Sequence, residues 1–304
     1  MRSSEPESVY APIRYVLAGG GKRLRAVLVL FAAETVGGSA RAALPAAAAV
    51  EMLHNFTLVH DDIMDHADLR RGRPTVHRRW NTSVAVLAGD QLVALAYEVL
   101  LKSKAAAAPR LPELFTRAFI DVCDGQGFDY EFESRTDVSM KEYLEMITLK
   151  TGRVMAAAAE IGGVAGGGSA RQNRALRVYG EQLGRAFQIR DDLLDIVGTE
   201  KEFGKTIGGD ITEGKKTFLL IEAYRRSAGA DRRLLGRVIR RRGITKRSVG
   251  RVRTLYRELG VIAAAESAVA AATRQAQRAL RALPPSPSRE ALDRLAEQLL
   301  SRKV

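Results

Sequence analysis

The sequence predicts an all-α protein, because its apolar residues follow the period of helices. They recur at steps of three and four over long stretches, which is the spacing of one helix face. Alternating patterns typical of strands are scarce, and strands do not alternate with helices as in a parallel sheet. Alanine-rich segments are abundant, and alanine has the highest helix propensity. Hydrophobic residues make up 46% of the 304 positions, so the chain can bury a sizeable core and general disorder is excluded.

The expected helices follow one another with short breaks. They span residues 25–36, 45–65, 82–102, 112–133, 139–162, 171–197 and 214–227. A turn with Pro284, Pro285 and Pro287 precedes a last helix over about 288–302. Only 18 residues precede the glycine turn at 19–21, so the first helix is short or the start is truncated. The Gly-rich breaks at 36–38, 71–74, 162–168 and 204–209 do not resemble domain linkers, and a single domain over 1–304 is predicted.

The positive charge is confined to one part of the chain. The net charge is +13, and residues 222–304 hold 20 of the 48 Lys and Arg but 7 of the 35 Asp and Glu. The rest of the chain is therefore neutral. In the C-terminal part the arginines alternate with apolar residues at helical spacing, which favours a solvated helix face over a nucleic-acid surface.

Cysteine content and hydropathy indicate a cytoplasmic protein. Cys123 is the single cysteine, so neither an intrachain disulfide nor a cysteine zinc cluster is possible. Because no run of about 18 apolar residues occurs, we expect no transmembrane segment. The polar, acid-containing N-terminus does not resemble a signal peptide.

Two Asp-Asp-x-x-Asp clusters are the strongest functional signal. Each closes an apolar helical run; they comprise Asp61, Asp62 and Asp65, and Asp191, Asp192 and Asp195. On a helix the first and last Asp share a face, whereas the middle one is rotated by about 100°. Carboxylates this close repel unless a cation lies between them, and magnesium prefers such oxygens together with phosphate. One cluster alone is typical of a solvated acidic face, but two predict a site for a metal-bridged diphosphate.

Basic residues that suit diphosphates accompany the clusters. Lys22 and Arg25 follow a Gly-rich turn at a helix start, a place that attracts anions. Arg70, Arg71 and Arg73 lie in one turn after the first cluster and form a good phosphate clamp. Further candidates are Lys150 with Thr151, Lys205, and Lys215 with Lys216. Each could also be an ordinary loop residue. His54 lies seven residues before Asp61 and shares its helix face, although a lone His is often a core residue.

Together these residues resemble the trans-isoprenyl diphosphate synthases, also called polyprenyl synthetases. The segments GGGKRLR, LVHDDIMDHADLRRGRPT, GQGFD, LKTG, FQIRDDLLD, FGKTIGGD and EGKKTFLL occur in the family's order between residues 19 and 220. The resemblance implies an all-α bundle around a central cavity, usually as a homodimer. It also implies condensation of isopentenyl diphosphate with an allylic diphosphate through an allylic carbocation.

The resemblance further implies a role for each site residue. Magnesium, as three ions per site in this family, binds Asp61, Asp65, Asp191 and Asp195, supported by Asp62 and Asp192. Arg70, Lys150, Lys205 and Lys215 hold the allylic diphosphate, with Thr151 and Gln188 nearby. Lys22, Arg25, His54 and Arg71 hold isopentenyl diphosphate, and Gln126 and Asp129 line the site.

Residues before the first cluster set the product length in this interpretation. Phe56 lies five residues before Asp61, about 7.5 Å along a helix. Thr57 lies one turn before Asp61, and Leu53 about one turn further. In the family, an aromatic residue followed by a small one at these places resembles the twenty-carbon, geranylgeranyl pattern. Farnesyl or longer products remain alternatives, and Phe56 could simply pack in the core.

Three other functions fit parts of the pattern. A class I terpene cyclase also uses an Asp-rich motif, but its second metal motif usually mixes Asn, Ser or Thr with Glu. A non-catalytic subunit of a prenyl synthase commonly lacks one Asp motif, whereas both are present here. A nucleic-acid-binding protein would explain the charge, yet no known binding module is evident.

Overall fold

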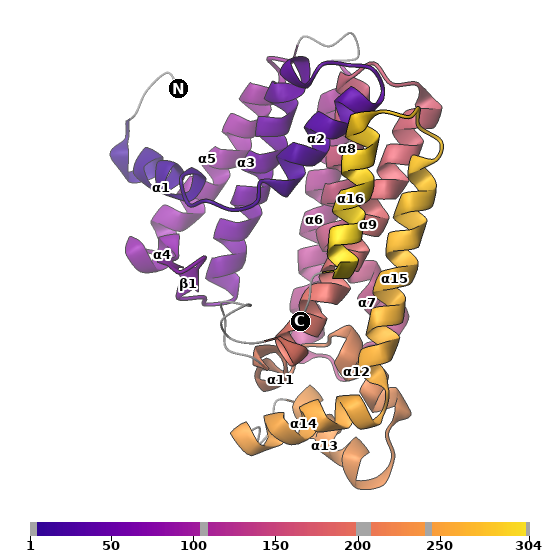
Figure 1. The fold of residues 1–304 in the computed structure, drawn as a ribbon. Helices are drawn as coiled ribbons and strands as arrows, with labels where there is room; N and C mark the ends of the chain where they lie inside the picture. The colour runs from indigo at the N-terminus through magenta and orange to yellow at the C-terminus, as the bar shows by residue number, and fades with distance from the viewer. Residues whose placement is uncertain (1–4, 104–108, 199–207, 241–244, 302–304) are drawn as a thin grey trace. The chain divides into compact units, whose positions relative to one another are not determined.

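The computed structural model describes residues 5–103, 109–198, 208–240 and 245–301, and the predicted all-α fold is confirmed (Figure 1). The helices of the first half are α1 (Glu7–Leu17), α2 (Leu24–Thr35), α3 (Ala40–Met64), α4 (Val76–Arg79), α5 (Thr82–Leu100) and α6 (Arg110–Ser134). Those that follow are α7 (Met140–Ile147), η1 (Thr148–Gly152), α8 (Arg153–Ala165), α9 (Ala170–Val197), α11 (Gly209–Glu213), α12 (Phe218–Arg226), α13 (Gly229–Ile239), α14 (Lys246–Glu258), α15 (Val261–Leu280) and α16 (Pro287–Ser301). In the described part of the chain the strands are β1 (Leu69–Arg70) and β2 (Arg73–Pro74), an antiparallel hairpin.

Most predicted helices are found within two residues of their expected ends. α3 begins five residues earlier than predicted, at Ala40. The stretch 139–162 is one continuous path but contains the π-helical turn η1 between α7 and α8. The helix predicted from 214 begins only at Phe218, because Thr217 is its N-cap and accepts a hydrogen bond from the Leu220 N–H. The hairpin and the short α4 and α11 were not predicted.

The chain forms two compact units, each built from separate segments. Unit 1 comprises Met1–Phe119, Ala157–Leu176 and Leu283–Leu292, and unit 2 comprises Ile120–Ala156, Arg177–Ala282 and Asp293–Val304. The first Asp cluster belongs to unit 1 and the second to unit 2.

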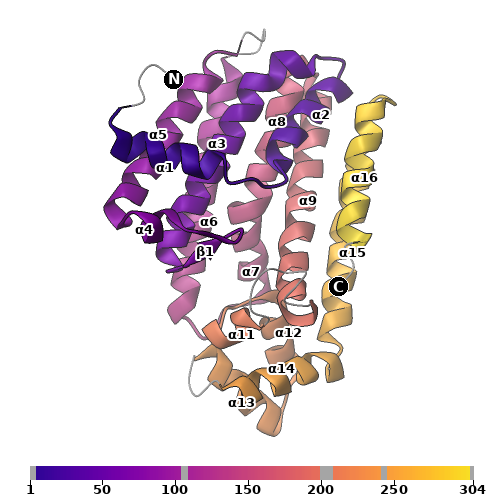
Figure 2. The ribbon, with the colours of Figure 1, turned by 60° about the vertical axis from the view of Figure 1, so that its left-hand side comes forward.

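In unit 1, α3 packs between α2 and α5, and α1 lies across α3 and α5 (Figure 2). The buried residues of α3 include Val50, Leu53 and Val59. The packing of α1, α2 and α5 around α3 thereby positions the end of α3 and the β1–β2 hairpin that follows it. Gly162 of α8 permits close approach to α2, since a Cβ there would lie 2.2 Å from the Val29 carbonyl oxygen.

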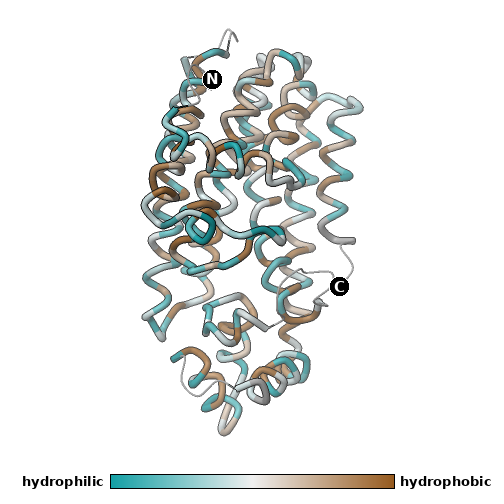
Figure 3. The backbone as a smooth tube through the Cα atoms, turned by 90° about the vertical axis from the view of Figure 1, so that its left-hand side faces the viewer, coloured by the Kyte–Doolittle hydropathy of each residue, from teal (hydrophilic) through white to brown (hydrophobic). Residues whose placement is uncertain are grey.

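In unit 2, α12 packs against α13, α14, α15 and α7. The hydropathy of successive residues alternates along the helices, as expected of amphipathic helices that bury one face (Figure 3). The basic C-terminal part follows this pattern: α14 buries Val252, Leu255 and Tyr256, while Arg251 and Arg257 are exposed.

By length and composition alone, α3 and α5 are long and apolar enough to cross a membrane. In the most apolar windows of α3 and α5, 56% and 39% of the residues are buried inside the protein. Core helices of soluble proteins meet the same criteria, and α3 packs between α2 and α5.

Candidate active site

The first Asp cluster lies where α3 ends. Asp61 and Asp65 are one turn apart, and Asp65 is exposed at the C-cap. Asp62 instead turns inward and is buried. Its Oδ1 accepts hydrogen bonds from Arg70 Nε at 2.8 Å and from Arg70 Nη2 at 2.5 Å. Burial raises the pKa of Asp62, and the bonds to Arg70 oppose that rise. Asp62 therefore fixes Arg70 beside the cluster.

The β1–β2 hairpin presents its arginines around a tight turn. Arg71 and Gly72 form the turn, both with positive φ, of 53° and 72°. The Arg71 guanidinium donates to the Gly20 carbonyl oxygen and lies against Gly21, where a Cβ would be 2.5 Å from Arg71 Nη1. Because Gly21 also has a φ of 111°, glycine is required there for the Arg71 contact.

Unit 1 gathers basic side chains around His54. We call Arg23, Arg25, Arg70 and Arg71 the basic cluster. Burial and the charges of Arg25, Arg71, Arg70 and Arg23 lower the pKa of His54 well below its usual value. The imidazole is therefore neutral at pH 7 and can bond a ligand without adding to the charge. A cavity of about 50 Å³ near this cluster is lined by Asn55, Asp62, Arg70 and Arg71 among others.

In unit 2, the π-helical turn η1 carries Lys150 and Thr151. Lys150 Nζ donates to Asp129 Oδ2 of α6 at 2.6 Å. Gly125 makes this approach possible, since a Cβ there would lie 2.3 Å from the Lys150 backbone nitrogen. Burial of Asp129 opposes its ionisation, but Lys215 and Lys150 outweigh that effect and lower its pKa. The half-buried carboxylate of Asp129 thus holds Lys150 and attracts Lys215.

The middle residue of the second Asp cluster is held by a chain of hydrogen bonds. Asp192 Oδ2 accepts from the Tyr143 hydroxyl at 2.6 Å, and Oδ1 accepts from Gln188 Nε2 at 3.1 Å. The Thr151 hydroxyl donates to Gln188 Oε1 at 3.0 Å. Asp192 is buried, so these bonds replace the water that it loses.

The last residue of that cluster meets the start of another helix. Asp195 is buried, and its Oδ2 accepts from the Asp210 backbone N–H at 3.2 Å, at the N-terminus of α11. Burial, and next the carboxylate of Asp210, raise the pKa of both Asp192 and Asp195. Several carboxylates are therefore crowded where their negative charges repel.

These groups of unit 2 surround a small polar cavity of about 90 Å³. Its lining residues are Asp129, Tyr143, Met146, Ile147, Lys150, Thr151, Gln188, Asp192, Lys215, Lys216 and Thr217. Lys150 and Lys215, predicted to bind a phosphate group, thus line the cavity together with Asp192 of the second cluster and the amide of Gln188.

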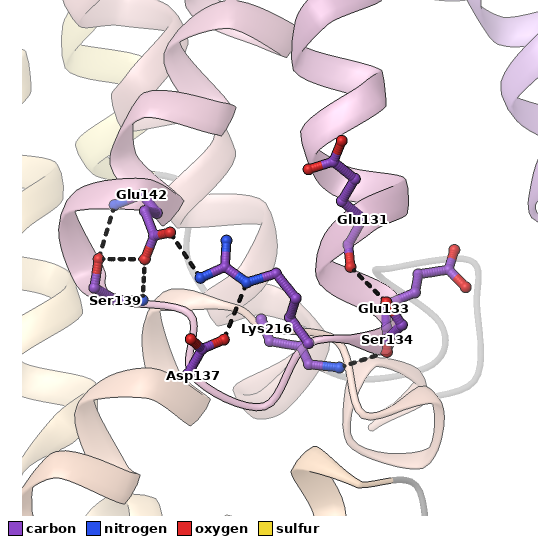
Figure 4. Close-up of polar contacts among 8 residues, drawn as sticks. Glu131, Glu133, Ser134, Asp137, Ser139, Glu142 and Lys216 are labelled. Carbon is purple, nitrogen blue, oxygen red and sulfur yellow. Dashed lines mark hydrogen bonds and ion pairs between the residues drawn. The ribbon is translucent and has the colours of Figure 1, made fainter.

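Lys216 ties the Lys215 segment to the end of α6. It is buried, and its Nζ donates to the Glu133 carbonyl oxygen at 2.9 Å (Figure 4). A cation at the last carbonyls of a helix is favourable because of the helix dipole. The turn that follows is held by Arg135, which contacts Asp137 at 3.0 Å and Glu142 at 2.8 Å (Figure 4).

The structure brings many predicted residues together within each unit. In unit 1 these are Arg25, His54, Asp62, Arg70 and Arg71, and in unit 2 Asp129, Lys150, Thr151, Gln188, Asp192 and Lys215. Lys22 is exposed, Gln126 is half-buried and Asp191 is half-buried. Lys205 lies outside the described residues. Sequence reasoning missed Arg23, Glu51, Tyr143 and Asp210; only Glu51, at helical spacing before His54, carried a local signal.

The residues predicted to set product length lie on the middle of α3. Phe56 is buried, with its ring centroid 5.4 Å from that of Phe119 and 4.7 Å from that of His60. Leu53 is buried, and the Thr57 hydroxyl donates to the His54 carbonyl at 2.8 Å. Phe56 therefore packs against α6.

The donor chemistry suits magnesium, although the side chains do not form a ready ion cage. Among the described residues, no three His, Cys, Asp or Glu side chains converge on a point that could hold an ion. The crowded carboxylates of Asp192, Asp195 and Asp210 nevertheless supply hard oxygen donors whose mutual repulsion a divalent cation would relieve. The residues present therefore fit this metal.

Comparisons with known proteins agree with this geometry. Residues 6–259 match the family model described as polyprenyl synthetase. A geranylgeranyl pyrophosphate synthase of Geoglobus acetivorans is 40% identical over 304 residues, covering 99% of this chain and 93% of its own. A geranylfarnesyl diphosphate synthase of Natronomonas pharaonis is 42% identical over 246 residues, covering 75% and 71%.

A solved structure shows the same fold. The geranylgeranyl pyrophosphate synthetase of Pyrococcus horikoshii superimposes with a TM-score of 0.92 at 37% identity, covering 98% of this chain and 91% of its own. Motifs, fold and sequence identity lead to one conclusion. The chain belongs to the polyprenyl synthetase family.

Proposed function

We propose that this trans-prenyltransferase joins isopentenyl diphosphate to an allylic diphosphate and releases geranylgeranyl diphosphate as its main product. Membership of the polyprenyl synthetase family supports the reaction class and both substrates. The observation that carries the proposal is the unit 2 cavity, in which Lys150 and Lys215 lie beside the buried Asp192. Ammonium groups next to carboxylates suit a diphosphate bound together with a divalent cation.

We assign the two diphosphates to different groups. Arg70, Lys150, Lys205 and Lys215 hold the allylic diphosphate, with Thr151, Gln188, Gln126 and Asp129 as supporting residues. Lys22, Arg25, His54 and Arg71 hold isopentenyl diphosphate. The neutral imidazole of His54, surrounded by arginines, suits a hydrogen bond to a phosphate oxygen. Asp61, Asp65, Asp191 and Asp195 would hold magnesium, with three ions per site as the proposed number.

The reaction follows from charge stabilisation. Bound magnesium would neutralise charge on the leaving diphosphate. Lys150 and Lys215 donate hydrogen bonds to the same group as the allylic C–O bond breaks and the diphosphate leaves with the electron pair. The π electrons of isopentenyl diphosphate then form the new C–C bond with the allylic cation. The departed diphosphate takes the proton that is lost, so no side-chain base is needed, and no side-chain nucleophile is needed because the double bond of isopentenyl diphosphate attacks the cation.

Product length is proposed from the residues of α3. Phe56 and Thr57 favour twenty carbons, and relatives are named for geranylgeranyl and geranylfarnesyl products. Farnesyl diphosphate or a longer chain is the alternative. We also propose a homodimer in the cytoplasm without a transmembrane segment, in which the whole chain acts as one catalytic domain.

A magnesium-dependent incubation tests the function. Purified protein receives labelled isopentenyl diphosphate with dimethylallyl, geranyl or farnesyl diphosphate in turn, and dephosphorylated products are sized by chromatography. We expect one twenty-carbon alcohol that is lost with EDTA. A product of a different chain length would support the prenyltransferase activity and contradict the assigned twenty-carbon product. Folded protein that condenses no starter would reject the function in favour of a cyclase or a partner-dependent subunit.

A pair of lysine variants tests the site. Lys150→Met removes a donor to the leaving diphosphate, and we expect kcat to fall about 100-fold or more. Lys141→Met is the matched control, since Lys141 is exposed on α7 of the same unit. Equal activity of the two variants would contradict the assignment of Lys150.

A further inference from the structure

Glu51 is a carboxylate within the basic cluster of unit 1. It lies three residues before His54 on α3, so the two side chains share a helix face. Its Oε1 accepts from Arg23 Nη1 at 3.3 Å. Its charge also opposes the lowering of the Arg71 pKa by burial and by Arg23. Glu51 therefore interacts with two arginines of the cluster.

Burial of Glu51 is unfavourable for a carboxylate unless nearby positive charges compensate for it. The residue is 8% exposed, and its Oε2 is buried with no hydrogen-bond partner among the described residues. An unsatisfied buried carboxylate oxygen costs free energy. The basic side chains of the cluster repel one another, and the carboxylates of Glu51 and Asp62 offset part of this repulsion.

Glu51 also fixes the side chain of Arg23, the residue at the start of α2. Arg23 is the N-cap of α2 and has a left-handed backbone, with φ 49° and ψ 34°. A non-glycine residue in this region is strained. Its side chain is fixed by Glu51 and by a bond from Nη2 to the Leu17 carbonyl at 2.5 Å. Lys22 and Arg25 lie on either side of this position in the sequence.

We infer that Glu51 is an internal counter-ion that holds the basic cluster together until an incoming diphosphate takes over its role. Glu51 and the diphosphate neutralise the same arginines, so the presence of one reduces the stabilisation that the other provides. Because such coupling is reciprocal, removing the charge of Glu51 destabilises the free protein and strengthens its binding of a diphosphate. The ligand's identity as isopentenyl diphosphate rests on the proposed function.

Glu51→Gln tests the inference, with Glu160→Gln as the matched control. Glu160 is equally buried in unit 1 and pairs with Arg110 at the same distance of 3.3 Å. The melting temperature is measured in EDTA with and without inorganic pyrophosphate. We expect both variants to melt lower than the wild type. Pyrophosphate should raise the melting temperature of Glu51→Gln more than that of the wild type or the control. An equal or smaller rise would overturn the inference.

Variants of Arg23 keep the test decisive if Glu51→Gln does not fold. Arg23→Gln lowers the positive charge of the cluster, and its pyrophosphate response should be smaller than that of the wild type. The double variant Arg23→Gln with Glu51→Gln restores the balance of charge, so its response should return to the wild-type value. A double variant that responds like Arg23→Gln alone would refute the counter-ion.

Calorimetric titration with isopentenyl diphosphate separates this inference from the proposed function. We expect Glu51→Gln to bind it about fivefold more tightly than Glu160→Gln does. If the wild type fails to condense its substrates but the pyrophosphate difference is found, the function is wrong and the counter-ion stands. If condensation is normal and the difference is absent, the counter-ion is wrong and the function stands.

Discussion

Side chains on different faces of α3 make different contacts. His54 and Asp62 face basic residues, whereas Phe56 contacts the rings of His60 and Phe119. Middle residues of both Asp clusters turn inward, where Asp62 meets Arg70 and Asp192 meets Tyr143. The 100° step between neighbouring helix positions explains this division. Asp61, Asp65 and Asp191 are more exposed, whereas Asp195 is buried like Asp192. These four remain the proposed metal ligands.

Phe56→Ala should lengthen the product, because removing the ring opens space next to Phe119 along the proposed path of the growing chain. Products from isopentenyl and farnesyl diphosphate are sized by chromatography. Phe115→Ala is the control, since Phe115 is fully buried in unit 1 and contacts Tyr97. An unchanged product from Phe56→Ala would show that Phe56 serves only core packing.

At the scale of elements, close helix contacts place the side chains of the cavity in unit 2. Gly125 lets α6 approach η1 until Asp129 meets Lys150, and Gly127 has open space around its Cβ position. The widened π turn displaces Lys150 and Thr151 from a regular helical path, a feature frequent at functional sites. Helix packing, more than loop structure, therefore determines the distance between Asp129 and Lys150.

Gly125→Ala and Gly127→Ala form a matched pair on one helix. The new Cβ at 125 would lie 2.3 Å from the Lys150 nitrogen, so we expect a loss of about 1–3 kcal/mol in stability and lower activity. The same change at 127 should raise stability by about 0.5–1 kcal/mol, because alanine favours helix. Urea unfolding and steady-state kinetics measure both effects. Equal behaviour of the two variants would rule out the close contact as the cause.

Glu222 pairs with two arginines of its own helix, α12, and should make stability depend on pH. It accepts from Arg225 Nη2 at 2.6 Å and from Arg226 Nε at 2.8 Å. Mainly the bonds from Arg225 lower the pKa of Glu222 from 4.5 to about 2. Because the folded pKa is the lower one, its contribution is complete above pH 4.5 and is lost as the pH falls towards 2.

Glu222→Gln should therefore be less stable than the wild type at pH 7, by about 1–3 kcal/mol. The difference in unfolding free energy between Glu222→Gln and the wild type should become small near pH 2 and vanish below it. Urea unfolding across this range gives the two curves, and Glu266→Gln, on the exposed side of α15, should follow the wild type throughout. A difference independent of pH would contradict the role of the charge.

At the scale of the whole molecule, exposed apolar side chains suggest association. α6 exposes Ile120, Phe128 and Tyr130 in unit 2. Phe128 follows Ile120 by about two turns, so the two lie on the same side of the helix, whereas Tyr130 lies about 200° round from Phe128. The proposed homodimer would remove Ile120 and Phe128 from water.

Light scattering should give a mass about twice the 33.2 kDa of one chain. Phe128→Glu should shift it towards the monomer, because burying a carboxylate in an apolar interface is costly. Leu101→Glu changes an exposed residue after α5 and should leave the mass unchanged. A monomeric wild type would contradict the homodimer, and a dimeric Phe128→Glu would place the interface elsewhere.

Local patterns along the chain were sufficient for much of the prediction. Helix positions follow from apolar spacing within a few residues, and the Asp clusters follow from spacing within one turn. Motif order was enough to identify the family, because it is a property of the chain itself. The π turn η1, the hairpin and the start of α12 were missed, since close packing and a single cap residue decide them.

The sequence by itself determined the helical class, the family and the identity of most candidate residues. The tertiary structure decided the partners of those residues: Arg23 for Glu51, Tyr143 for Asp192, and the α11 N-terminus for Asp195. These partners lie 28, 49 and 15 positions away along the chain. Spacing within a helix predicts a shared face, but only packing brings distant segments close enough for charge and hydrogen bonding to act.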